Sequence, residues 1–201
     1  MAFQNIVMEC TGCGASITVD PALRFGNCPY CGRCNSLVQS AKAAEQPVVE
    51  NIFPVSNKRE DRYVLGNSMG SHGAFKWALN CPEFFAAAAG MSGAGDLEEL
   101  GFYDRMPNRV INSFGTLEEY RNSYNDFKYL YGKLLKEGSY IPRFYACCGT
   151  EDGFYYGAKK FAVDAKAQGF PILFEEGEGG HEWGFWDRWL PIMLDHMLKE
   201  D

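Results

Sequence analysis

The sequence predicts an α/β fold, with parallel strands flanked by helices, preceded by a small module built around cysteines. In residues 47–201, short apolar runs alternate with helical patterns, which is typical of strand–helix–strand units. Five of the eight cysteines lie between Cys10 and Cys34, whereas the others are dispersed. The small, polar stretch around Pro47 is typical of a linker. We therefore expect a module over residues 1–46 and a larger domain over residues 47–201.

The composition is that of a folded protein with little affinity for polyanions. Hydrophobic residues make up 46% of the chain, which is enough to form a core. The net charge of -7 repels phosphates and anionic lipids, so neither nucleic acid nor a membrane is an expected partner. The chain has no long apolar run and no secretory signal pattern at its start. We expect a cytoplasmic protein whose cysteines bind metal or stay reduced.

Four cysteines form two C-x2-C pairs, each followed by a glycine: Cys10 with Cys13, and Cys28 with Cys31. The glycines allow tight turns, so that each pair presents two thiolates to one ion. Four thiolates complete a tetrahedral site and leave no position open for a substrate. The spacing therefore predicts a structural Zn²⁺ ion.

Two short strands are expected beside these pairs, at Ala15–Val19 and Ser36–Gln39. Cys34 is a fifth thiol that competes as a ligand, but the paired spacing favours the other four. The segment from about residue 8 to residue 40 resembles a zinc ribbon. A reduced cysteine-rich hairpin and an iron–sulfur site remain as alternatives.

Residues 62–79 combine a short apolar strand, a G-x-S-x-G turn around Ser68 and a helix that begins at once. This context is typical of a nucleophile elbow, in which a cramped turn exposes the serine hydroxyl. We expect Gly66 and Gly70 to leave room for that backbone. The backbone N–H of Met69 is the expected donor to an oxyanion. The alternative is a glycine-rich turn without a catalytic role.

Two later strands each lead into a loop with a catalytic type of residue. The strand Pro142–Cys148 leads into Asp152, and the strand Pro171–Glu175 leads into His181. A helical pattern lies between them and ends at Gly169, so both loops are expected at the same edge of a sheet. An imidazole can take the proton of a serine hydroxyl, and a carboxylate can fix the tautomer of the imidazole.

Other residues compete for these roles. Glu151 adjoins Asp152, although the motif favours the latter. His72 lies one turn after Ser68, and a histidine on the same helix as the nucleophile is more often packed. A last apolar stripe is expected to form a helix that breaks or restarts at Pro191, with His196 at its surface. Three aromatic residues near His181 either line a pocket or, as we favour, pack in the core: Trp183, Phe185 and Trp186.

Three segments together are similar to the esterase D and tributyrin esterase group of α/β-hydrolases, which includes feruloyl esterases: GNSMGSHGAFKWAL, CCGTEDGFY and GEGGHEWGFWDRWLP. The resemblance covers about residues 50–198. It implies hydrolysis of small or aromatic acyl esters through an acyl-enzyme, without a cofactor for catalysis. It also implies that Ser68 is the nucleophile, that His181 is the base and then the acid, and that Asp152 orients the imidazole.

The family's first strands, and its upstream loop with a second oxyanion donor, have no counterpart before Ser68. A strand–helix–strand unit takes about 30 residues, more than the interval between the cysteine module and Val64 holds. We therefore expect a partial, N-terminally truncated α/β-hydrolase sheet with one bare edge. Such an edge favours a homo-oligomer or covering by the front module. The alternative hypothesis is a non-enzymatic zinc-ribbon protein that carries an inactive hydrolase remnant.

Overall fold

The computed structural model describes residues 6–10, 13–19, 25–31, 34–36, 55–56 and 58–199. The chain forms two compact units, Met1–Asn57 and Lys58–Asp201. The boundary expected after residue 46 lies outside the described residues and stays a prediction. Within the described ranges, no helix is long and apolar enough to cross a bilayer.

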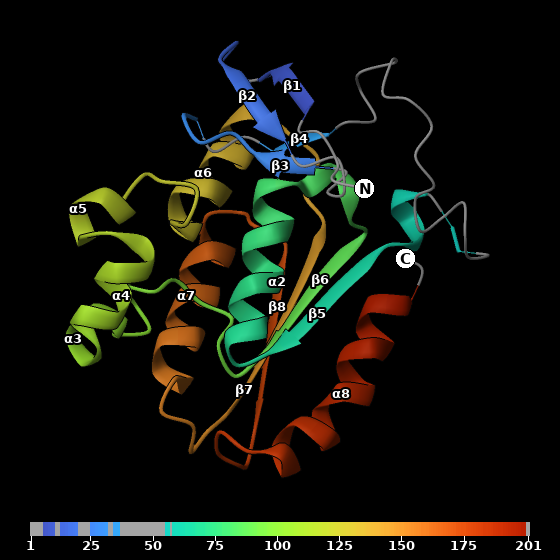
Figure 1. The fold of residues 1–201 in the computed structure, drawn as a ribbon. Helices are drawn as coiled ribbons and strands as arrows, with labels where there is room; N and C mark the ends of the chain where they lie inside the picture. Colours follow the sequence, from blue (N-terminus) through green and yellow to red (C-terminus); the bar gives the residue numbers. More distant parts are fainter. Residues whose placement is uncertain are drawn as a thin grey trace, which may run out of the picture. The chain divides into compact units, whose positions relative to one another are not determined.

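The described residues of the first unit form two small antiparallel sheets (Figure 1). Strand β1 (Ile6–Glu9) pairs with β2 (Ser16–Val19), and β3 (Phe25–Asn27) pairs with β4 (Cys34–Ser36). Each C-x2-C pair lies in the connection between two paired strands. Strand β2 matches the expected one, whereas β4 begins earlier than expected and residues 37–39 lie outside the described ranges.

The second unit is built on a parallel sheet with the strand order β5-β6-β7-β8. The strands are β5 (Tyr63–Asn67), β6 (Ala87–Met91), β7 (Arg143–Gly149) and β8 (Ile172–Gly177). Among the described residues β5 pairs only with β6, and its residues are half-buried or exposed, whereas those of β6 are fully buried. Self-association through this edge stays a prediction.

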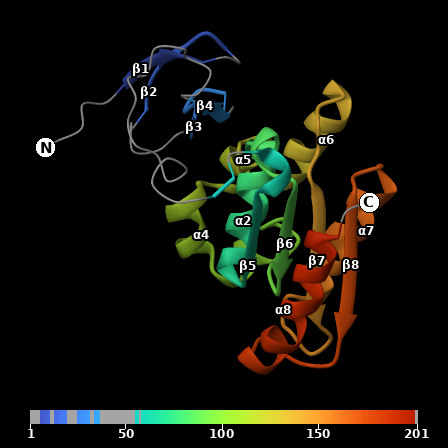
Figure 2. The ribbon, with the colours of Figure 1, turned by 90° about the vertical axis from the view of Figure 1, so that its right-hand side faces the viewer.

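Helices cover both faces of this sheet (Figures 1 and 2). Helices α2 (Met69–Asn80), α6 (Phe127–Glu137) and α7 (Tyr155–Ala167) pack on one face, and α8 (Trp183–Leu198) packs on the other. The parallel sheet flanked by helices is therefore confirmed. Three short helices lie between β6 and α6: α3 (Phe102–Arg105), α4 (Pro107–Phe114) and α5 (Leu117–Tyr120). Two 3-10 turns, η2 (Arg59–Asp61) and η3 (Pro82–Phe84), precede β5 and β6.

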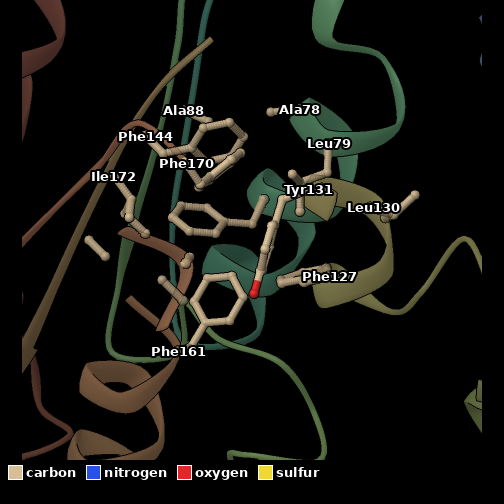
Figure 3. Packing of buried hydrophobic residues seen from close by; sticks show 14 of the residues in the cluster. Ala78, Leu79, Ala88, Phe127, Leu130, Tyr131, Phe144, Phe161, Phe170 and Ile172 are labelled. Carbon is tan, nitrogen blue, oxygen red and sulfur yellow. The ribbon is translucent and has the colours of Figure 1, made fainter. Parts of the chain in front are cut away.

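The larger core is an aromatic cluster between the sheet and the helices α2, α6 and α7 (Figure 3). Successive residues of a strand point to opposite faces, so Ala88 joins this core while Ala87 and Ala89 face α8. The buried aromatic side chains of the larger core are Phe75, Phe85, Phe127, Tyr131, Phe144, Phe161 and Phe170.

One strand has no counterpart among the elements predicted from the sequence, and one helix differs from its prediction. Strand β6 consists of Ala-Ala-Ala-Gly-Met, which lacks the β-branched residues that mark a strand. Its small residues allow α2 to pack closely on the strand, because a Cβ atom at Gly90 would lie 2.2 Å from Ser71 Oγ. The break at Pro191 does not occur, and α8 continues through it. Pro191 lies on the exposed side of α8, where water can satisfy the carbonyl that loses its partner.

Candidate active site

Ser68 occupies a sharp turn between β5 and α2. Its backbone has φ 53 and ψ -122, a conformation that an L-residue rarely adopts. Its N–H donates to the carbonyl of Met91 at 2.8 Å, which ties the turn to β6. A Cβ atom at Gly66 would lie 2.2 Å from the carbonyl oxygen of Gly70, so glycine is required there. The same expectation for Gly70 is wrong, because the space beside its Cα is open.

The loop that carries Asp152 packs against the loop that carries His181. The N–H of Thr150 donates to the carbonyl of Gly177 at 2.9 Å, which continues the pairing of β7 and β8 into both loops. A Cβ atom at Gly149 would lie 2.0 Å from the carbonyl oxygen of Gly179. Only glycine therefore permits the two loops to approach this closely.

Three side chains from three loops meet at this edge of the sheet. Ser68 Oγ lies 2.8 Å from His181 Nε2, and His181 Nδ1 lies 2.9 Å from Asp152 Oδ2. The side chain of Asp152 is completely buried, and its other oxygen accepts the N–H of Phe154 at 2.9 Å. Because an ionised carboxylate only accepts hydrogen bonds, Asp152 favours the tautomer with hydrogen on Nδ1, which leaves Nε2 to accept the Ser68 hydroxyl proton.

The competing residues lie elsewhere. Glu151 is exposed, and its backbone N–H donates to the carbonyl of Gly179. The ring of His72 stacks on Phe127 at 4.6 Å, and burial, with Lys76 nearby, lowers the pKa of His72 to about 4. His72 is thus a packed residue, as expected.

His196 is not the surface residue that was expected. Its side chain is 26% exposed, stacks on Tyr145 and lies 2.7 Å from a carboxylate oxygen of Glu175. The difference arises because α8 lies across the sheet, so that its inner side faces residues of β7 and β8.

Met69 is the first residue of α2. A backbone N–H in the first turn of a helix has no acceptor within the helix and lies at the positive end of the helix dipole. The Met69 side chain is 82% exposed, so only its backbone is tied to the turn. The expected position of an oxyanion donor therefore coincides with the start of a helix.

The loop after β6 also contacts the turn at Ser68. A Cβ atom at Gly93 would lie 2.5 Å from the carbonyl oxygen of Ser68. Further along this loop, the buried carboxylate of Asp96 accepts the hydroxyl of Tyr120 at 2.7 Å, and burial raises the pKa of Asp96. This hydrogen bond fastens α5 to the loop that contacts the turn at Ser68. This contact has no signal in the sequence, because the composition of β6 is not that of a strand.

Two aromatic rings contact the imidazole of His181. The ring centroids of Phe154 and Trp186 lie 5.2 Å and 5.1 Å from it, both in a T-shaped arrangement. Phe185 and Trp186 are buried, as expected, whereas Trp183 is 71% exposed. Phe154 follows Asp152 by two residues, and Trp186 follows His181 by five. This closeness in sequence is the one signal that could have indicated the contacts of the two rings with the imidazole.

The first unit brings the four paired cysteines together. The sulfur atoms of Cys10, Cys13, Cys28 and Cys31 all lie within 4.8 Å of one another. The Cys10–Cys31 and Cys13–Cys28 sulfur distances are 3.5 Å and 3.8 Å. A tetrahedron of sulfur atoms about 2.3 Å from a zinc ion has edges of about 3.8 Å, so the donor set fits zinc.

A family model described as "Putative esterase" matches residues 38–138. This match covers half of the chain and includes the turn at Ser68. The chain belongs to this esterase family. The match begins before the second compact unit, so residues 38–57 also resemble the family.

Individual relatives agree with this membership. An acetyl esterase of Caldicellulosiruptor saccharolyticus is 28% identical over 159 residues, which are 74% of this chain and 59% of the relative. The solved structure of a substrate-bound, fluorophosphonate-binding serine hydrolase F of Staphylococcus aureus is 29% identical with a TM-score of 0.67, over 76% of this chain and 60% of that one.

The apoenzyme structure of an S-formylglutathione hydrolase of Staphylococcus aureus is 27% identical with a TM-score of 0.60. That match covers 75% of this chain and 56% of the hydrolase. The chain thus spans about three fifths of the length of the esterase relatives that it matches.

Proposed function

We propose that this chain is a serine carboxylesterase that uses Ser68, His181 and Asp152. The observation that carries the proposal is the continuous hydrogen-bond path from Ser68 Oγ through both ring nitrogens of His181 to the buried Asp152 carboxylate. Membership of the esterase family supports it. Motif order alone would be weaker support, because G-x-S-x-G turns also occur without catalysis.

The reaction follows from these contacts. Ser68 Oγ attacks the ester carbonyl carbon while its proton passes to His181 Nε2, and a tetrahedral oxyanion forms. The imidazolium then returns the proton to the departing alkoxide, which leaves an acyl-enzyme on Ser68. Water attacks this acyl group by the same proton path and releases the carboxylic acid. The negative charge of Asp152 stabilises the imidazolium and holds its tautomer.

The oxyanion requires hydrogen-bond donors where its charge develops. We assign the first to the backbone N–H of Met69, which the helix dipole of α2 reinforces. Removal of one such donor costs on the order of 10²- to 10³-fold in rate in known hydrolases. A site with one such donor and the triad should therefore still hydrolyse esters, at a lower but measurable rate.

The substrates we propose are small-molecule esters with short or aromatic acyl groups. The naming of one relative as an acetyl esterase supports short acyl chains. Trp183, two residues after His181, exposes aromatic surface and packs on Trp186. Flat rings pack well against such surface, which supports aromatic acyl groups.

Labelling with a fluorophosphonate tests this function. The reagent phosphonylates a serine only when a neighbouring base activates its hydroxyl. We expect one label per wild-type chain in intact-mass spectra, no label on Ser68→Ala, and unchanged labelling of Ser113→Ala, which removes an exposed hydroxyl in α4. A panel of p-nitrophenyl esters should show turnover that is lost with Ser68→Ala. Folded wild-type protein that neither labels nor hydrolyses any ester would support the inactive remnant instead.

We also propose that Cys10, Cys13, Cys28 and Cys31 bind one structural Zn²⁺ ion. The closeness of the four sulfur atoms supports this proposal. The N–H of Tyr30 lies 3.4 Å from Cys28 Sγ, a contact of the kind that stabilises a thiolate ligand. When bound, the ion would hold the two cysteine turns together in a unit with a small core.

A further inference from the structure

The loop that carries His181 has little conformational preference of its own. Its sequence from Gly177 is Gly-Glu-Gly-Gly-His, and Gly179 has φ 132, which is open chiefly to glycine. The imidazole is one-third exposed. The backbone alone therefore does not hold the ring in one orientation, although attack by Ser68 requires Nε2 to point at Oγ.

Two aromatic rings limit the movement of this imidazole. Phe154, at the start of α7, contacts it at 5.2 Å with an interplanar angle of 76°. Trp186, in the first turns of α8, contacts it at 5.1 Å with an angle of 86°. The rings come from two different helices, and neither replaces the bonds that the ring nitrogens make to Ser68 and Asp152.

Each of the two rings is held by its own neighbours. Trp186 is only 8% exposed and belongs to the core beneath α8, with Met193 and Met197. Phe154 stacks on Phe102 of α3 at 5.3 Å with an angle of 15°. Arg105 of α3 donates to the carbonyl of Gly153 at 3.1 Å, which also fixes the start of α7. The rings are thus rigid walls, and one of them is supported by the segment between β6 and α6.

We propose that Phe154 and Trp186 are positioning residues that hold the imidazole of His181 in line with Ser68 Oγ. This inference rests on the proposed esterase function and adds two residues to its mechanism. A displacement of about 1 Å at a reacting group can cost on the order of 10²-fold in rate. The glycine residues before His181 would allow such displacements of the imidazole if the aromatic walls were removed.

The test compares Trp186→Leu, Trp186→Phe and Phe154→Leu with wild type in p-nitrophenyl acetate hydrolysis. We expect Trp186→Leu and Phe154→Leu to lower kcat on the order of 10- to 100-fold, with KM changed less than about twofold. Trp186→Phe keeps a ring against the imidazole and should recover most of kcat. The matched control is Tyr156→Leu, in α7, two residues after Phe154: Tyr156 is exposed, and its ring packs on Tyr155. Its kcat should stay near wild type.

A second measurement separates positioning from folding and does not need turnover. The proton shared between His181 Nδ1 and Asp152 should give a downfield ¹H NMR signal. We expect it to be lost or broadened in Trp186→Leu and retained in Trp186→Phe, while thermal unfolding shows all variants folded. A retained signal and unchanged kcat in folded Trp186→Leu would overturn the proposal.

The outcomes also separate this inference from the proposed function. If wild type shows neither turnover nor labelling, the esterase function fails, yet the NMR comparison still decides whether the rings hold the imidazole. If wild type is active and the leucine variants match it, only the positioning role fails.

Discussion

Two adjacent carboxylates follow β7, and only one of them faces the imidazole. The side chain of Asp152 is fully buried and is bonded to His181 and to the N–H of Phe154, whereas Glu151 is exposed. A buried carboxylate loses its water and is stabilised only by such specific partners. The two side chains differ in burial and partners because the turn after Gly149 points them in different directions.

At this scale, Asp152→Asn should lower kcat by about 10³- to 10⁴-fold, because an amide that donates to Nδ1 favours the wrong imidazole tautomer. Glu151→Gln is the matched control and should stay within about twofold of wild type. Hydrolysis of p-nitrophenyl acetate measures both effects, with thermal unfolding as a check on folding. Equal losses in the two variants, or a loss confined to Glu151→Gln, would reassign the acid.

At the scale of elements, the ends of β7 and β8 determine the geometry of the site. These strands pair in parallel up to Gly149 and Gly177, and their loops continue the pairing through Thr150 and Glu151. The backbones of the two loops are therefore tied to each other as far as Glu151 and Gly179, two residues before His181. Their separation depends on the absence of a side chain at Gly149.

Gly149→Ala tests this dependence. The new Cβ would lie 2.0 Å from the carbonyl oxygen of Gly179, so one loop must move. We expect the free energy of unfolding to fall by about 1–3 kcal/mol. We also expect kcat to fall by more than the smaller fraction of folded protein accounts for, because the catalytic groups are displaced. Gly132→Ala, in α6, is the control, because no atom lies near its new Cβ. It should leave kcat unchanged and stabilise the protein by up to about 1 kcal/mol. Wild-type kcat and stability in Gly149→Ala would contradict this role.

At the scale of the whole molecule, two kinds of chemistry occupy separate units. The four paired cysteines lie in Met1–Asn57, whereas Ser68, Asp152 and His181 lie in Lys58–Asp201. The second unit has extensive cores on both faces of its sheet, while the described residues of the first contain a small cluster around Cys10, Ile17 and Cys28. A small core is stabilised by a metal more than a large one is.

The zinc proposal is tested at this scale. Purified wild type should contain one zinc per chain by elemental mass spectrometry, and Cys28→Ser should contain little. Cys147→Ser, which changes a cysteine buried in the sheet, should keep its zinc. Removal of zinc with a strong chelator should leave fluorophosphonate labelling of Ser68 intact, because Ser68 is not one of the proposed ligands of the ion. If wild type expressed in zinc-supplemented medium contains no zinc after purification, the zinc site is ruled out.

Local motifs in the sequence predict much of the candidate site and of the fold. The G-x-S-x-G turn, the strands that end before Asp152 and His181, and the paired cysteines each depend on a few adjacent residues. Their spacing is set by backbone geometry within one turn or strand, so the sequence was sufficient to nominate the three site residues and the esterase family. It also predicted the sheet and its flanking helices, because periodicity is a local property.

The tertiary structure decided what depends on contacts between distant segments. Strand β6 has no strand-like composition, yet it pairs in parallel with β5 and β7, and α2 packs on its small residues. Likewise, Pro191 stays within a helix because its exposed side lies in water, and Trp186 contacts His181 because α8 folds back across the sheet. Such contacts join residues of different segments, and the periodicity of the sequence indicates only neighbours within one helix or strand. Packing therefore selected the orientation of the site, while the sequence specified its chemistry.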